Sequence, residues 1–126
     1  MGRQLAGRAP VDPMPQGPRR LRVDLHGHDV RTALRLATTR VEEAYRNGYD
    51  TIELVHGAAN VQEPVEDGRG RIKWELRHLV TAGAFDRFCD PGGTWMKSGS
   101  VLLRLRRNPR ARRDTWSREP PPAHRR

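Results

Sequence analysis

An acidic residue and a histidine two positions apart, Asp24 and His26, have the types and spacing that proton-transfer chemistry needs. They belong to the stretch LRVDLHGHD at residues 21–29, where apolar and polar residues alternate as in a strand with one buried face. Residues two apart project from the same side of a strand, here the side away from the core. A carboxylate beside an imidazole can transfer protons near neutral pH. The alternative interpretation is an ordinary surface acid beside an ordinary turn histidine.

A second histidine–glycine pair, His56–Gly57, ends a second predicted strand over Tyr49–His56. Between the two strands, Asp29 is a suitable helix N-cap, an apolar stripe with spacings of three and four follows it, and Asn47–Gly48 is typical of a helix end. A strand–helix–strand unit has a right-handed crossover and parallel strands, which end at the same edge of the sheet. We therefore expect His26 and His56 to meet at that edge.

A pair of glycines, in the run Gly68–Arg69–Gly70, precedes a second predicted helix that Arg71 opens and Gly83 closes. Backbone N–H groups at a glycine-rich helix start can bind an anion. No Gly-Lys-Ser/Thr follows, so this is not a Walker A loop. We expect Gly70 to lie beside the two histidine–glycine turns, which would make the three turns one candidate site.

The chain ends in two further predicted strands, over Ala84–Cys89 and Ser100–Arg106, with a turn at Pro91–Gly93. No helix connects them, so the pair is expected to be antiparallel. The strands alternate in character instead of being continuously apolar, so both helices should cover one face of the sheet and leave the other exposed. The predicted fold class is therefore α/β, as an α+β two-layer sandwich of β-α-β-α-β-β order with a mixed four-stranded sheet and two helices on one face.

The 126 residues provide room for one domain, and the net charge of +9 is unevenly distributed. The first twenty residues contribute +3 and residues 106–126 contribute +6, so residues 21–105 are formally neutral. Both termini are rich in proline and arginine, which is typical of disorder. We predict a domain over residues 21–106 between disordered basic tails at 1–20 and 107–126, and we expect sequence-independent attraction to phosphate to reside mainly in the tails.

The sequence also argues against several classes of protein. A single cysteine, Cys89, cannot form an intrachain disulfide or a multi-cysteine zinc site. No apolar run approaches the roughly 20 residues of a membrane span, and the N-terminus lacks the apolar region of a secretory signal. The predicted location is cytoplasmic, with no membrane partner.

Several of these motifs together resemble a known family. Residues 23–27, VDLHG, match an L-D-x-H-G motif with valine in its first position, and His56–Gly57 begins an H-G-x-G motif. Gly92–Gly93 and Gly99–Ser100 correspond to a glycine-rich segment before the last strand. On these residues, the chain from 20 to 106 resembles a small MutS-related (Smr) domain. It departs from the family in the middle motif, where residues 58–67 separate His-Gly from Gly-x-Gly.

The resemblance implies a fold like the C-terminal domain of translation initiation factor 3 and an endonuclease that cleaves DNA or RNA, including RNA on ribosomes. It implies His26 as general acid or base, Asp24 as the group that orients it, and His56 as a second proton carrier or phosphate contact. No cofactor and no metal are implied. The predicted partners are nucleic acid and the ribosome, and the predicted phosphate-binding residues are Gly27, Gly57, Gly68, Arg69, Gly70, Arg71 and Lys73.

Two other hypotheses stay open. One is a non-catalytic module that binds nucleic acid or the ribosome through the same edge, which the altered middle motif and the neutral core favour. The other is a metal hydrolase, because a mixed histidine and carboxylate set could hold a metal ion. The members of that set would be Asp24, His26, His28 and His56.

Overall fold

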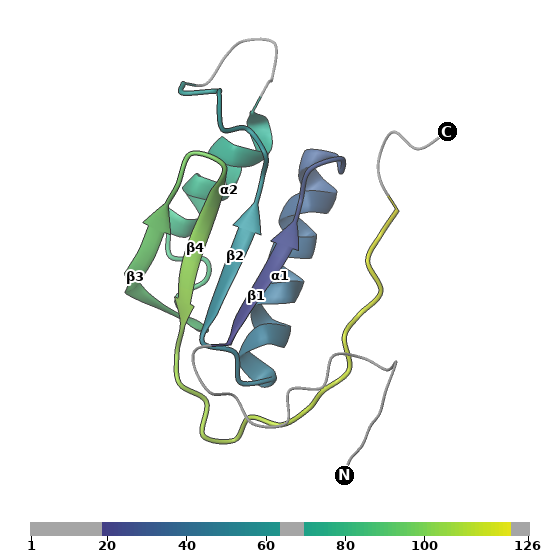
Figure 1. Cartoon of the computed structure of the whole chain (residues 1–126), viewed down its shortest axis with the longest axis vertical. Helices are drawn as coiled ribbons and strands as arrows, with labels where there is room; N and C mark the ends of the chain where they lie inside the picture. Colours follow the sequence, from purple (N-terminus) through teal and green to yellow (C-terminus); the bar gives the residue numbers. More distant parts are fainter. Residues whose placement is uncertain (1–18, 64–69, 122–126) are drawn as a thin grey trace.

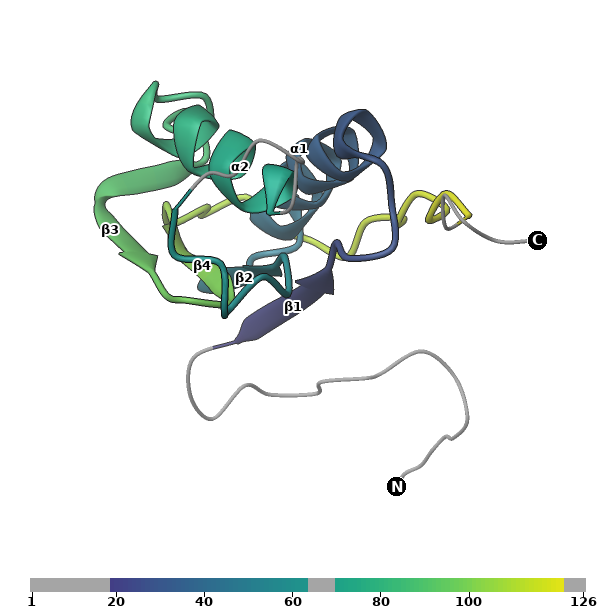
Figure 2. The same ribbon diagram turned by 90° about the horizontal axis from the view of Figure 1, so that it is seen from above.

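The computed structural model describes residues 19–63 and 70–121 as a four-stranded sheet with two helices on one face (Figure 1). Figure 2 shows both helices on the same side of the sheet. The predicted element order, strand mixture and two-layer arrangement are confirmed. The elements are β1 (Arg20–Asp24), α1 (Val30–Arg46), β2 (Thr51–Val55), α2 (Arg71–Thr81), β3 (Cys89–Met96) and β4 (Ser100–Leu105).

The strand order in the sheet is β1-β2-β4-β3. β1 pairs in parallel with β2, whereas β4 is antiparallel to both β2 and β3. As predicted, the crossover through α1 makes the first two strands parallel and the short final connection makes the last two antiparallel. β1 and β2 therefore both end at one edge, next to the starts of α1 and α2.

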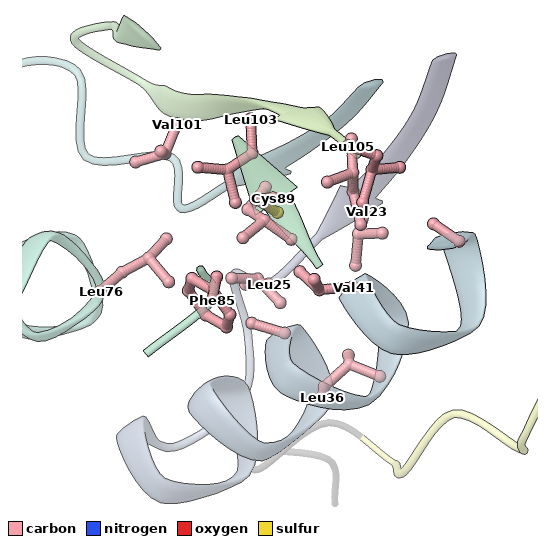
Figure 3. Packing of buried hydrophobic residues seen from close by; sticks show 14 of the residues in the cluster. Val23, Leu25, Leu36, Val41, Leu76, Phe85, Cys89, Val101, Leu103 and Leu105 are labelled. Carbon is pink, nitrogen blue, oxygen red and sulfur yellow. The ribbon is translucent and has the colours of Figure 1, made fainter. Parts of the chain in front are cut away.

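The core lies between the sheet and the helices (Figure 3). Alternate strand residues and one stripe of each helix fill it, and burying a Val, Leu or Ile side chain stabilises the fold by roughly 1.5–3 kcal/mol. The strands contribute Val23, Ile52, Leu54, Val101, Leu103 and Leu105, the turn after β1 contributes Leu25, and the helices contribute mainly Ala33, Leu36, Ala37, Val41, Ala44 and Leu76.

The ends of α1 follow the sequence signals. The carboxylate of Asp29 accepts a hydrogen bond from the backbone N–H of Thr32 at 3.4 Å, as an N-cap does. Asn47 is the C-cap and Gly48 adopts a left-handed φ of 77°, so the helix ends where the glycine permits the chain to turn.

The predicted third strand is wrong in position. Residues 84–88 form turns, and β3 begins only at Cys89 and runs through Pro91–Gly93, where a turn was expected. Phe85 and Cys89 are both buried and lie four apart, a helical spacing, and the Cys89 N–H donates to the Phe85 carbonyl at 2.8 Å. β3 is an edge strand, which tolerates proline and glycine, and its register against β4 shifts between Cys89 and Thr94.

Residues 107–121, here called the C-terminal strap, lie beside α1, in contrast to the predicted disordered tail (Figure 1). The Asp114 N–H donates to Oδ1 of Asn47, and the Ser117 N–H donates to Oε2 of Glu43, both at 2.8 Å. The strap is held by polar contacts to groups that α1 presents. Such contacts leave no apolar periodicity in the sequence, which is why composition alone predicted disorder. The rest of that tail, and all but the last two residues of the predicted N-terminal tail, lie outside the described residues.

No helix in the described part of the chain combines the length and the hydrophobicity that crossing a membrane requires.

Candidate functional site

The two histidine–glycine turns and the start of α2 line one open cleft of about 880 Å³. His26, His56 and Gly70 all contribute to its wall, as the parallel strands predicted. The first two turns touch, because a Cβ placed on Gly57 would lie 3.5 Å from Cβ of His26. Gly57 has a φ of +78°, a conformation that glycine adopts without strain. The volume is in the range of small-molecule and cofactor pockets.

The Asp24–His26 pair has the geometry of an oriented base. Nδ1 of His26 lies 2.7 Å from Oδ1 of Asp24, which also accepts the His26 backbone N–H at 3.1 Å. Partial burial raises the pKa of Asp24, but the hydrogen bonds from His26 outweigh this and hold the pKa below its usual value. The carboxylate is therefore ionised at neutral pH and fixes the ring. Nε2 makes no hydrogen bond within the described part of the chain, and the His26 side chain is 71% exposed.

His56 has a different environment. Its residue exposure is only 4%, and its Nδ1 accepts the backbone N–H of Ala58 at 3.2 Å, so the proton of the neutral ring is on Nε2. Burial lowers the pKa of His56 to about 4, and the charges of Lys73 and Arg77 contribute to the lowering. At neutral pH the ring is uncharged. Its Nε2 is buried and has no partner among the described residues. His56 is therefore suited to donating a hydrogen bond and poorly suited to carrying a proton.

The start of α2 is shaped by a glycine. Gly70 is the N-cap with a φ of 76°, and no side chain caps the first N–H groups of the helix. A Cβ at this position would lie 2.9 Å from Cγ1 of Val61, so the loop and the helix start pack too closely for any other residue. Uncapped N–H groups and the positive end of the helix dipole favour an anion at this wall of the cleft.

Of the cationic residues predicted around this helix start, Arg71 and Lys73 are described and behave differently. Arg71 lines the cleft with a side chain that is 62% exposed and lies 3.9 Å from Glu75. Lys73 is almost fully buried, and its Nζ donates to the carbonyls of Ala58 at 3.3 Å and Val61 at 2.6 Å. Burial lowers the pKa of Lys73. Its ammonium ties down the loop after His56, which leaves Arg71 as the exposed cation of α2 at the cleft.

Of the predicted phosphate-binding glycines, Gly27 also lines the cleft, with a φ of 91° and open space on the side where a Cβ would project. Gly68 and Arg69 lie outside the described residues. Sequence reasoning missed Arg31, an exposed residue in the first turn of α1 that lines the same cleft. Its position directly after the first histidine motif was the signal available in the sequence.

His28 lies beside the C-terminal strap. Its side chain is 2% exposed, and its Nε2 lies 3.4 Å from Oε2 of Glu119. Within residues 19–63 and 70–121, no group of three or more His, Cys, Asp or Glu side chains is arranged to hold a metal ion. The four residues of the metal-hydrolase hypothesis, which include Asp24 and His26, do not form such a group.

No protein-family model matches this chain, and no curated protein or solved structure is significantly similar to it.

Proposed function

We propose that this chain is an endonuclease that cleaves phosphodiester bonds in DNA or RNA, with Asp24 and His26 as its acid–base pair. The observation that carries the proposal is the 2.7 Å contact between Nδ1 of His26 and Oδ1 of Asp24, with Nε2 left without a partner among the described residues. The resemblance of residues 20–106 to a small MutS-related domain, in which the same Asp and His are implicated in cleavage, supports it.

In this reaction Nε2 of His26 accepts a proton from the attacking hydroxyl, which is a water or an RNA 2′-hydroxyl. The new oxygen–phosphorus bond forms as the bond to the leaving oxygen breaks, and the leaving oxygen takes up a proton from solvent. The ionised carboxylate of Asp24 keeps the ring in place and stabilises the imidazolium. A correctly placed general base of this kind contributes roughly 10²–10⁴-fold to the rate.

The part of the cleft wall formed by the starts of α1 and α2 would hold the phosphate. Arg31 and Arg71 are exposed cations at the starts of α1 and α2, on either side of the two histidine turns. The N-terminus of α2, which no side chain caps, directs positive potential into the cleft, whereas the Asp29 carboxylate caps that of α1. Charge that develops on the phosphoryl oxygens is stabilised by such fixed donors. His56 is neutral and its Nε2 is buried, so it would shape this wall of the cleft without contacting the phosphate.

A binding module without catalysis is the second candidate. The arrangement of Lys73 and His56 favours it, because the Lys73 ammonium is bonded to backbone carbonyls and His56 is neutral at pH 7. Such a protein would use the same cleft and its arginines to hold a backbone phosphate without cutting it.

The test is cleavage of a labelled RNA and of a DNA of the same sequence, each as a single strand and as a hairpin, with and without a chelator. His26→Ala is expected to slow cleavage by roughly 10²–10⁴-fold and to change affinity little. The matched control is His78→Ala, since His78 is a histidine of α2 that does not line the cleft. Binding without cleavage by the wild-type chain, or equal losses of binding and cleavage in His26→Ala, would establish the binding module instead. Cleavage that the chelator abolishes would point to the metal hydrolase.

A further inference from the structure

An exposed tryptophan lies on the face of the sheet that carries no helix. Trp95 is 66% exposed, more than any other large hydrophobic side chain in the described part of the chain. It pairs with Leu102 across β3 and β4, whereas the neighbouring β4 residues Val101 and Leu103 are buried in the core. Side chains alternate along a strand, so Trp95 and Leu102 point away from the helices. The ring therefore adds little to the core, and folding does not explain it.

The row of residues that crosses this face continues to the opposite edge of the sheet. Leu102 pairs with Glu53 of β2, and Glu53 pairs with Arg22 of β1. Asp24 follows Arg22 by two residues on the same face, at the end of β1. Three strand spacings of about 4.8 Å separate β3 from β1. One continuous surface thus leads from Trp95 to the carboxylate that holds His26.

An arginine lies beside the tryptophan because the neighbouring strand has no side chain there. A Cβ on Gly93 would lie 2.6 Å from Cβ of Arg104 and 3.3 Å from its Cδ. The stem of Arg104 therefore lies against the backbone of β3 at Gly93, two residues from Trp95 and on the same face. An aromatic plane and an arginine on the same face, two strand positions apart, are a combination that can hold a base and its phosphate.

The charge of this face is positive on balance. Four exposed cationic side chains lie on this face, and Asp24 and Glu53 are the carboxylates that β1 and β2 present there. The Glu53 carboxylate accepts hydrogen bonds from Oγ of Ser100 at 2.6 Å and Nζ of Lys97 at 3.3 Å, so the charges of Glu53 and Lys97 offset one another. The cations are Arg20, Arg22, Lys97 and Arg104. Such a face complements a phosphate backbone.

We propose that this helix-free face binds an unpaired segment of nucleic acid, with a base stacked on Trp95 and the backbone on Arg104 and Arg22, and leads it to Asp24 and His26. The inference rests on the proposed function and gives it a substrate class. A duplex keeps its bases stacked inside, so a flat aromatic platform of this kind reads unpaired bases.

The test measures binding of a fluorescein-labelled unstructured oligonucleotide, as RNA and as DNA, and of the same strand in a duplex. All proteins are full-length and carry His26→Ala, so that cleavage does not affect the measurement. Trp95→Ala is expected to weaken single-strand binding by roughly 5- to 150-fold, the effect of one lost base stack, and Trp95→Phe to retain most of it. Met96→Ala is the matched control, because Met96 is the adjacent exposed apolar residue and pairs with Val101 on the other face. It is expected to leave affinity unchanged.

Unchanged single-strand affinity in Trp95→Ala would overturn the inference, as would tighter binding of the duplex with the same dependence on Trp95. If Trp95→Ala changes the oligomeric state without changing the binding of the oligonucleotide, the face is an interface with a second copy of the chain. That result would also overturn the inference. These outcomes are independent of the proposed cleavage. Cleavage that depends on His26 but not on Trp95 would uphold the proposed function alone, and Trp95-dependent binding without cleavage would uphold the binding face alone.

Discussion

His56 is a buried neutral histidine, and its protonation is coupled to folding. Its pKa is about 4 in the folded chain and about 6.5 when unfolded. Below pH 6.5 the unfolded chain takes up a proton that the folded chain does not, so stability falls as the pH decreases from 6.5 toward 4. We expect the titration of His56 to lower the free energy of unfolding by about 2 kcal/mol when the pH falls from 7.5 to 5.

Urea denaturation of wild type and His56→Asn at these two pH values measures the effect. The asparagine Oδ1 can still accept the Ala58 N–H, but it does not titrate. The variant is expected to lose about 2 kcal/mol less than the wild type over this range, because the other histidines are common to both proteins and contribute equally. Hydrogen bonds hold the pKa values of Asp24, Asp29 and Glu53 below their usual ones, so these carboxylates titrate below this window. Equal losses in both proteins would show that His56 is not neutral in the fold.

At the scale of elements, the C-terminal strap stabilises α1. Glu43 is almost fully buried and accepts the Ser117 N–H, and Asn47 at the C-cap accepts the Asp114 N–H. The ring of Trp116 packs edge-on against Tyr49 at 5.9 Å between centroids. Loss of the strap exposes these groups but leaves the core cluster intact, so the fold should persist with reduced stability.

We expect a chain truncated after Arg107 to lose about 1–3 kcal/mol of unfolding free energy, because each lost hydrogen bond is worth about 1 kcal/mol and the entropy of ordering the strap offsets part of the sum. Thermal or urea unfolding checks this. Truncation after Pro121 is the control, since the described contacts of the strap lie before that point. Stability equal to that of the full chain would mean that the strap contacts contribute nothing.

At the scale of the whole molecule, the charge lies outside the domain. Residues 21–105 are formally neutral, whereas residues 106–126 contribute +6. Arginines that contact phosphate release counterions, and each contact adds about −0.7 to −0.9 to the slope of log affinity against log salt. Because the strap is packed on α1, its arginines are held beside the domain instead of trailing from it.

Substitution of strap arginines by glutamine tests this without removing the strap. The four to change are exposed and are Arg110, Arg112, Arg113 and Arg118. Nucleic-acid affinity is expected to fall for all sequences alike, with a flatter salt dependence, and cleavage of saturated substrate is expected to stay nearly unchanged. A salt slope equal to that of wild type would assign the phosphate contacts to Arg22, Arg104 and the cleft.

The sequence by itself determined the features that depend on local spacing. Asp24 and His26 were expected to be neighbours because they are two residues apart, and the 2.7 Å contact confirms that they are, although β1 ends at Asp24 and His26 lies in the turn that follows. Because a strand–helix–strand crossover makes its two strands parallel, His56 was expected at the same edge of the sheet as His26, and it lies there. The helix caps and the apolar stripes are likewise local, because they follow from the helical repeat and from single residues such as Asp29 and Gly48.

Only the tertiary structure decided which polar groups are buried and which aromatic is exposed. Lys73 has the residue type of a surface cation, yet it is buried and its ammonium is held by the loop carbonyls of Ala58 and Val61. Trp95 has the type of a core residue, yet the shifted register of β3 turns it to the open face. The strap finds acceptors on α1 about 70 residues earlier in the chain. These outcomes depend on how distant segments pack together, and no local pattern encodes that packing.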